Sequence, residues 1–346
     1  MDSKTVITKE TKNKIRVDYE GKLTFKERLS KKLKTSNTWI KGIVNVFRFI
    51  LMLGVSFVII YPFVAKIAGS FMTREDVINP TIALIPKNFT GEIYKYVVID
   101  NHYFEALLNT FLLSLASALI QMLIACLVGY GLAKFKFKGN KLVMIAVIVT
   151  MIIPHSTLKY AMGQHLMHFD LFTIISWNYT GPIEAIFGKT LSLDDTFWPM
   201  IILSFCGLAF KNGLYIYLMR QFFKGVPDEL EESAYVDGSG TLRTFFQIIL
   251  PLAVPMLITL FLFSFSWQWT DEFYTRLFFT SGEVYLMPDV CKVPLTLEDP
   301  SLPGWDVYKQ VVINTASLMV IAPLIILYLF CQRYLVQGIE RSGLVG

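Results

Sequence analysis

Charged residues are scarce in this sequence of 346 residues. Asp, Glu, Lys and Arg make up 17% of it and hydrophobic residues 54%, whereas a soluble protein usually carries about 25% charged residues. The four cysteines are too few for a disulfide-rich secreted scaffold, and Cys126, Cys206 and Cys331 fall inside apolar runs where a cysteine packs as a small hydrophobic residue. The composition therefore predicts a protein of the lipid bilayer and disfavours redox or thiolate-metal chemistry.

Sequence motifs of several large enzyme classes are also missing. There is no GxxxxGK[ST], HExxH or CxxC stretch, so the chain is not expected to hydrolyse ATP alone or to hold a catalytic zinc ion. We expect no cofactor, no metal ion and no catalytic residue. His155, which follows Pro154, is interpreted at most as a capping or cavity-lining residue.

Positive charge is concentrated at the N-terminus. The first 41 residues contain 12 Lys and Arg against 5 Asp and Glu, so the excess is a basic tail and does not indicate binding of nucleic acid. Phe25, Leu29 and Leu33 recur at helical spacing among lysines, which predicts an amphipathic helix on an anionic membrane face within a cytoplasmic tail of residues 1–42. A solvated tail is the alternative, and we favour it for residues 1–20.

Six stretches are apolar and long enough to cross a bilayer as helices. They lie at about 43–65, 109–133, 141–163, 197–219, 252–278 and 311–333. Lys and Arg are most abundant in the tail and in the 134–141 turn, and cytoplasmic loops carry the excess of these residues. We therefore expect a multi-pass membrane protein, surrounded by membrane lipid, with both termini, this turn and the 220–250 loop in the cytoplasm. The segments 72–108, 164–196 and 280–310 are then outside, as ordered caps that could face a partner.

Aromatic, amide and carboxylate side chains gather at the end of the fifth stretch. Trp267, Gln268, Trp269, Asp271 and Glu272 fall here, and ionisable groups within spans are costly enough to be functional candidates. Aromatic rings can cover the C–H patches of a sugar while amides and carboxylates pair with its hydroxyl groups. The cluster predicts a substrate path for a sugar, with an interfacial tryptophan belt as the alternative.

Small polar residues share one face of the second stretch. Thr110, Ser114, Ser117 and Gln121 follow an i, i+4, i+7, i+11 spacing, and Asn109 precedes them. Such residues either line a path or bond neighbouring helices. Asn109, Ser114, Ser117 and Gln121 are therefore further candidates for the substrate path.

The segment 225–251 has the pattern of two short helices that meet at a glycine corner. Pro227 and the acids that follow it suit a helix N-terminus, Gly238 and Gly240 end that helix, and a second helix begins near Thr241. An ordinary solvated loop does not need this regularity. The pattern predicts a protruding knob that docks onto a cytoplasmic partner.

The same segment resembles a known family. Its run Glu232-Ser233-Ala234-Tyr235-Val236-Asp237-Gly238, followed by Ile249-Leu250-Pro251, is similar to the EAA loop of permease subunits of binding-protein-dependent ABC importers. Other matching runs begin at Tyr61, Tyr130, Met151 and Gln332, and together they follow the second permease of maltose-type carbohydrate importers over most of residues 43–346. The sequence departs from the family pattern at Ser233, at Thr270 and Asp271, and in a longer 164–196 segment.

The resemblance implies an all-α protein of a bacterial cytoplasmic membrane with the type I ABC importer permease fold, six transmembrane helices and cytoplasmic coupling helices. It implies four kinds of partner: a second homologous permease, two ATP-binding subunits that carry ATP hydrolysis, an extracytoplasmic solute-binding protein, and a sugar or oligosaccharide substrate. The residues it assigns to the ATPase interface are Glu231, Glu232, Ser233, Ala234, Asp237 and Gly238 in the loop, and Gln332, Arg333 and Gly338 in the C-terminal tail.

Three other functions stay open at this point. An ion-driven secondary transporter would use Asp271 or Glu272 but has no use for an acidic knob, and a structural membrane subunit has no use for a polar stripe. An ABC importer of a non-sugar solute is the third. A second EAA permease and a binding protein encoded beside this gene would exclude the first two.

Overall fold

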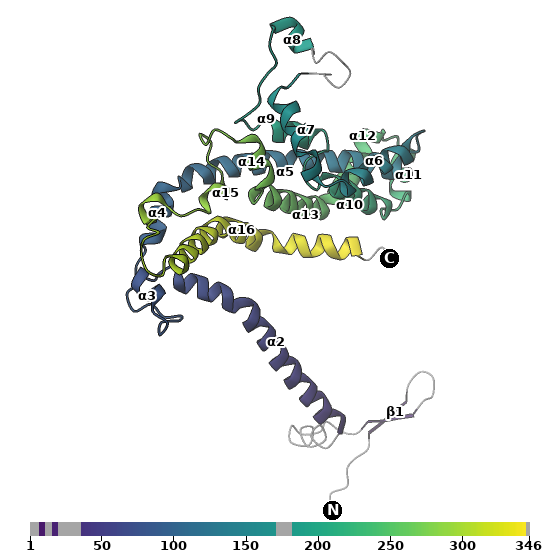
Figure 1. Ribbon diagram of the computed structural model, residues 1–346. Coiled ribbons are helices and arrows are strands. Elements are labelled where there is room, and N and C mark those ends of the chain that lie inside the picture. Colours follow the sequence, from purple (N-terminus) through teal and green to yellow (C-terminus); the bar gives the residue numbers. More distant parts are fainter. Residues whose placement is uncertain (1–6, 11–15, 20–35, 171–181, 344–346) are drawn as a thin grey trace, which may run out of the picture. The chain divides into compact units, whose positions relative to one another are not determined.

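The computed structural model describes residues 7–10, 16–19, 36–170 and 182–343 (Figure 1). The chain divides into two units, residues 1–65 and 66–346, which are described separately. The amphipathic helix expected around Leu29 lies outside the described residues.

The first unit contains a short β-hairpin and most of the helix α2. Strands β1 (Ile7–Glu10) and β2 (Arg16–Tyr19) pair antiparallel, with Ile7 opposite Tyr19. These two strands are the one departure from all-α structure among the described residues. Helix α2 (Ser36–Gly69) is apolar, and its side chains from position 40 to 64 are exposed, which suits contact with lipid or with another membrane subunit.

The second unit is helical in its described part. Its three longest helices are α5 (Tyr103–Lys134), α13 (Leu250–Trp269) and α16 (Trp305–Gly343). The other helices before α13 are α3 (Arg74–Ile78), α4 (Glu92–Asp100), α6 (Asn140–Ile152), α7 (His155–Met167), α8 (Pro182–Phe187), α9 (Trp198–Phe205), α10 (Asn212–Lys224), α11 (Glu229–Val236), α12 (Thr241–Thr244) and the π-helical turn η1 (Phe245–Ile249). After α13 come α14 (Phe273–Phe278), α15 (Met287–Val290) and the 3₁₀ turn η2 (Leu295–Leu297).

Helix α5 is central to this unit. It packs against α9, α10 and α13, and α13 in turn packs against α16 (Figure 1). The backbones of α5 and α10 approach closely at Gly129, where an added Cβ would lie 2.6 Å from the Cβ of Met219. Small residues allow such close approach between membrane helices, so Gly129 fixes how α5 meets α10.

The expected spans are only partly continuous helices. Four helical segments among the described residues are long and apolar enough to cross a membrane: Ile40–Gly69, Tyr103–Lys134, Thr241–Trp269 and Trp305–Leu335. The stretch at 141–163 is instead the pair α6 and α7, bent by 101° at Pro154, because a proline lacks a backbone N–H and drives the preceding residue out of helical conformation.

The stretch at 197–219 is also interrupted, between α9 and α10. The chain turns there through two residues of positive φ, Gly207 at 73° and Lys211 at 67°. The side chain of Asn212 donates a 3.1 Å hydrogen bond to the carbonyl of Ser204, which also accepts from the backbone N–H of Gly207 at 3.3 Å. These bonds cap the end of α9. A count of six crossings therefore stays a prediction.

Candidate functional site

The segment 225–251 forms the predicted pair of helices with a sharp corner. Helix α11 ends in a left-handed turn at Gly238, whose φ is 80°. The backbone N–H of Ser239 bonds to the carbonyl of Ala234 at 2.9 Å, and that of Gly238 to the carbonyl of Tyr235 at 3.0 Å. This pair of bonds is a Schellman motif, a helix ending that glycine favours.

Helix α11 is fastened to the C-terminal end of α5. The hydroxyl of Tyr130 donates a 2.6 Å hydrogen bond to Oε1 of Glu231. Nζ of Lys134 donates to Oδ1 of Asp228 and to the carbonyl of Val226, each at 2.6 Å, and lies 3.6 Å from Oε2 of Glu231. The hydrogen bond and the charge of Lys134 lower the pKa of the Asp228 carboxyl. These contacts tie the position of α11 to that of α5.

Glu231 therefore differs from the other acids expected at the ATPase interface. Its exposed fraction is 7%, and its carboxylate is engaged inside the chain. Ala234 is also buried, which explains why a small residue stands there. The structure thus gives both residues a role in holding α11 in place.

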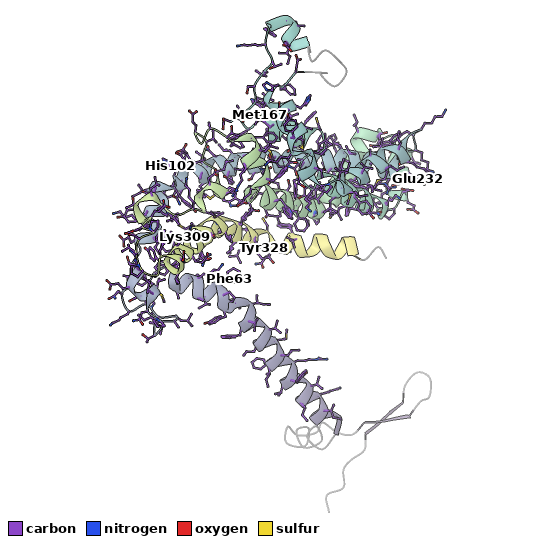
Figure 2. All side chains as sticks on the ribbon, viewed as in Figure 1. Phe63, His102, Met167, Glu232, Lys309 and Tyr328 are labelled. Atoms are coloured by element: carbon purple, nitrogen blue, oxygen red, sulfur yellow. The ribbon has the colours of Figure 1, made fainter. Side chains whose placement is uncertain are left out.

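The remaining loop candidates, Glu232, Ser233, Asp237 and Gly238, are exposed, and so are their neighbours Tyr235, Val236 and Leu242. We call these seven residues together the knob face. Figure 2 labels Glu232 at the end of the bundle where α11 lies. Val236 is 87% exposed and Leu242 75%. Exposed apolar side chains beside acids are typical of a protein–protein contact.

The C-terminal candidates lie on α16. Gln332 and Arg333 are exposed, and Gly338 falls within the same helix. The sequence predicts a tail that reaches a partner, and in the structure these residues continue the helix that packs against α13.

A cavity of about 10 Å³, with room for at most one water molecule, lies between α5, the α9–α10 break, α13 and α14. Its polar lining residues are Gln121, Ser264, Gln268 and Asp271, and its aromatic ones are Phe210, Trp267 and Tyr274. Nε2 of Gln121 donates to the hydroxyl of Ser204 at 3.1 Å, and Oε1 of Gln121 accepts from Ser264 at 2.7 Å. The cavity thus combines fixed amides, a carboxylate and ring faces.

Lys211 stands at the rim of this cavity and was not among the predicted residues. Its Nζ lies 5.1 Å from the ring centroid of Phe210 and 5.0 Å from that of Trp267, within the range of a cation–π interaction. His155, on α7, hydrogen-bonds the hydroxyl of Tyr274. A signal for Lys211 was present in the sequence, because it is a charged residue inside the apolar stretch 197–219.

The structure differs from expectation at two residues of the fifth stretch. Trp269 is 1% exposed, and its Nε1 donates a 2.9 Å hydrogen bond to the carbonyl of Val320 on α16. It therefore belongs to the core between α13 and α16 and does not line the cavity. Glu272 is exposed and lies 3.5 Å from Arg276 one turn later, so it is a surface residue of α14.

The polar stripe of the second stretch is divided between two roles. Gln121 is the one candidate of this stripe in the cavity lining. Asn109 donates to the carbonyl of Tyr285 at 3.1 Å and Thr110 accepts from the N–H of Met287 at 2.8 Å, so these two hold the segment that precedes α15. Ser114 and Ser117 are fully buried outside the lining, and their hydroxyls have no hydrogen-bond partner in the described part of the chain.

The described residues include apolar helices of spanning length, a protruding helix pair with acidic and apolar side chains, and an internal polar cavity. These are the features of a multi-pass membrane transport subunit. The family model described as "Binding-protein-dependent transport system inner membrane component" matches residues 121–341. The chain therefore belongs to this family, which is a family of transport permeases and not of enzymes. The resemblance to ABC importer permeases drawn from the sequence motifs is confirmed, and such permeases work with solute-binding and ATPase partners.

Individual relatives are similar along nearly the whole chain. Protein LplC of Bacillus subtilis (strain 168) is 25% identical over 90% of this chain and 97% of its own length. The polygalacturonan/rhamnogalacturonan transport system permease protein YtcP of the same strain is 24% identical over 87% and 97%. The arabinooligosaccharides transport system permease protein AraQ of Halalkalibacterium halodurans is 24% identical over 84% and 93%.

The fold is also found in a solved structure. One chain of the crystal structure of a bacterial ABC transporter involved in the import of the acidic polysaccharide alginate superposes with a TM-score of 0.65, at 20% identity, over 87% of this chain and 98% of that chain. At this identity the likeness shows the fold alone. It confirms the expected importer-permease fold class.

Proposed function

We propose that this chain is one of two related permeases of an ATP-driven importer for a sugar or oligosaccharide. An extracytoplasmic binding protein delivers the substrate, and two ATP-binding subunits dock on the knob face and hydrolyse ATP. YtcP is a permease of a polygalacturonan/rhamnogalacturonan transport system and AraQ one of an arabinooligosaccharide transport system, which supports a carbohydrate substrate for this chain. The aromatic, amide and carboxylate side chains of the cavity lining are of the types that bind sugars, and the transport cycle must widen the cavity before a sugar can enter it.

The observation that carries this proposal is that one helix serves both the knob and the cavity. Tyr130 and Lys134 hold α11 at one end of α5, while Gln121 lies in the cavity lining of the same helix. Gln121 and Lys134 are separated by about 20 Å along the helix axis, at 1.5 Å per residue. A rigid α5 converts movement of α11 into movement of the cavity wall.

Transport then follows an alternating-access cycle. Closure of the two ATP-bound subunits draws the knob faces of the paired permeases together, and α5 moves with α11 because Glu231 and Asp228 are bonded to it. The cavity opens toward the binding protein in that state and toward the cytoplasm after hydrolysis. In this scheme Glu232 and Asp237 pair with basic groups of the ATPase, and Gln332, Arg333 and Gly338 contribute a second contact.

Reconstitution in liposomes with the partner permease, the ATPase and the binding protein tests this function. We expect uptake of an oligosaccharide only with internal ATP, and stimulation of ATP hydrolysis by the loaded binding protein. Glu232→Lys should abolish stimulation, since it places a cation against a basic groove, whereas Glu298→Lys, in a loop expected outside, should not. Uptake driven by an ion gradient without ATP would support the alternative in which Asp271 carries a cation. Stimulation of ATP hydrolysis by a non-sugar solute and by no sugar would show that the substrate is not a carbohydrate.

The orientation is part of the proposal and has its own test. Cysteines introduced at Lys138 and Ser239 should react with a membrane-impermeant reagent only from the cytoplasmic side, and one at Asp194 only from outside. Labelling of any of the three from the opposite side would overturn the arrangement with both termini in the cytoplasm.

A further inference from the structure

Lys211 is the feature of the cavity that a neutral sugar does not explain. It lies within the apolar stretch 197–219, and a lysine inside a membrane segment is costly unless it faces a cavity or a partner. Hydroxyl groups need only amides and aromatic faces, and the cavity already offers Gln121 and Gln268 for that purpose. A permanent positive charge at this position requires a different explanation.

The surroundings of Lys211 leave its charge available. Nζ lies over Phe210 and Trp267, both cavity-lining rings. In the part of the chain that the structure describes, no carboxylate oxygen lies within 4 Å of this nitrogen. The side chain is exposed, so an anionic group of a ligand can reach it while the sugar ring lies on the aromatic faces.

The backbone at Lys211 is also unusual. Its φ of 67° is in the left-handed region, which glycine or asparagine adopts more easily than lysine. The conformation places this residue directly before the first turn of α10, beside Phe210. A lysine at a position better suited to glycine is a local conflict of the type found at functional sites.

Asp271 is the opposing charge in the cavity, and it is already engaged. Its Oδ2 accepts a 3.0 Å hydrogen bond from the backbone N–H of Tyr274, and its carbonyl accepts from Thr275. These bonds hold Asp271 at the start of α14. Asp271 therefore does not pair with Lys211, and the charge of Lys211, beside the rings of Phe210 and Trp267, is not neutralised by a carboxylate of the described residues.

We propose that Lys211 forms a subsite for a sugar carboxylate, so that the substrate of this permease is an acidic, uronate-containing oligosaccharide. The guiding interaction is a charge-assisted hydrogen bond from Nζ to the carboxylate, with the pyranose ring against Trp267 and Phe210. The inference rests on the proposed function and narrows its substrate class.

Equilibrium dialysis of radiolabelled sugars against the assembled complex, without binding protein, tests this subsite. The probes are trigalacturonate and maltotriose, an acidic and a neutral trisaccharide. We expect Lys211→Gln to weaken trigalacturonate binding by about tenfold or more, because a hydrogen bond to a charged group is lost, and to change maltotriose binding less than about twofold. Lys211→Arg should retain most of the preference for trigalacturonate. Lys309→Gln, which removes an exposed lysine charge of α16, should have no effect.

A second variant keeps the test decisive if Lys211→Gln fails to assemble. Asp271→Asn removes the opposing charge, so it should tighten trigalacturonate binding without tightening maltotriose binding. If the wild-type complex binds both sugars equally, or if neither Lys211→Gln nor Asp271→Asn changes their ratio, the carboxylate subsite is overturned while the proposed function stands. If the complex binds neither sugar, the carboxylate subsite is overturned as well, and the proposed function is decided by the uptake measurement in liposomes.

Discussion

The hydroxyl of Tyr130 donates a 2.6 Å hydrogen bond to Oε1 of Glu231, although the two residues are 101 positions apart in the sequence. Both side chains are buried. This bond joins the helix that lines the cavity to the helix that carries the knob face, so in the proposed cycle it is one route by which movement of α11 reaches the cavity wall.

Tyr130→Phe tests this route. The substitution removes the hydroxyl and leaves the Glu231 carboxylate with one fewer partner in a buried place, which costs about 1–3 kcal/mol. We expect faster amide hydrogen exchange in α11 and weaker stimulation of ATP hydrolysis, with the complex still assembled. Tyr328→Phe makes the same chemical change at an exposed tyrosine of α16 (Figure 2) and should alter neither quantity; equal exchange in α11 of both variants would show that the bond does not couple the helices.

The pair of Lys134 and Asp228 predicts a pH dependence. Lys134 lowers the pKa of the Asp228 carboxyl below its ordinary value of 3.8. A lowered folded-state pKa contributes stability above the ordinary pKa, and that stability is lost as the pH falls through the folded-state value. We expect Asp228→Asn to lower the thermal midpoint of the solubilised complex at neutral pH, and the gap to wild type to close as the pH falls below 3.8.

Glu229→Gln is the matched control for that measurement. It removes an exposed carboxylate from the same first turn of α11 without touching Lys134. A gap that stays constant down to the lowest pH, or an equal pH dependence in Glu229→Gln, would contradict a specific contribution from the ion pair.

Gly129 and Gly131 offer a packing test within one helix. A Cβ at Gly129 would lie 2.6 Å from the Cβ of Met219, whereas a Cβ at Gly131 would meet no atom within 4 Å. Gly129→Ala should destabilise the α5–α10 contact by about 1–3 kcal/mol. Gly131→Ala should be neutral or add up to about 1 kcal/mol, since alanine is the better helix former. Thermal midpoints in the reverse order would place the close approach of α5 and α10 elsewhere.

The corner at Gly238 can be tested against Gly240 in the same way. Valine at Gly238 must adopt a φ of 80°, which costs a β-branched residue about 1–2 kcal/mol, and the resulting turn misdirects Glu232 and Asp237. We expect Gly238→Val to leave membrane insertion intact, to weaken ATPase docking and to abolish stimulation by the loaded binding protein. Gly240 has an extended backbone and open space around its Cβ position, so Gly240→Val should keep normal ATPase docking and normal stimulation. Identical behaviour of the two variants would show that the left-handed corner does not determine ATPase docking.

The glycine corner is where the sequence was most informative. A short acidic helix, a glycine and a second apolar helix leave few conformations, and the left-handed Gly238 follows from local chemistry alone. Other features depend on distant residues. Glu231 and Glu232 are neighbours in the sequence, but only the first meets Tyr130, and this contact arises when α11 folds back onto α5. The bend in the third stretch was signalled by Pro154, and the break in the fourth stretch by the charge of Lys211. A count of apolar residues overlooks both signals.

The two tryptophans of the fifth stretch give the last test, because composition alone treats them alike. They are two positions apart on α13, which turns one toward the cavity and the other toward α16: Trp267 is exposed and lines the cavity, while Trp269 bonds the carbonyl of Val320 in the core. Trp269→Ala should therefore lower the stability of the complex by about 3–5 kcal/mol and reduce assembly. Trp267→Ala should assemble normally and lower sugar-dependent turnover, since the ring face beside Lys211 is lost. For each variant, stability is measured as the thermal midpoint of the complex and transport as uptake per assembled complex. A normal midpoint in Trp269→Ala with impaired uptake would return this tryptophan to the substrate path, and unchanged uptake in Trp267→Ala would remove the aromatic edge from the site.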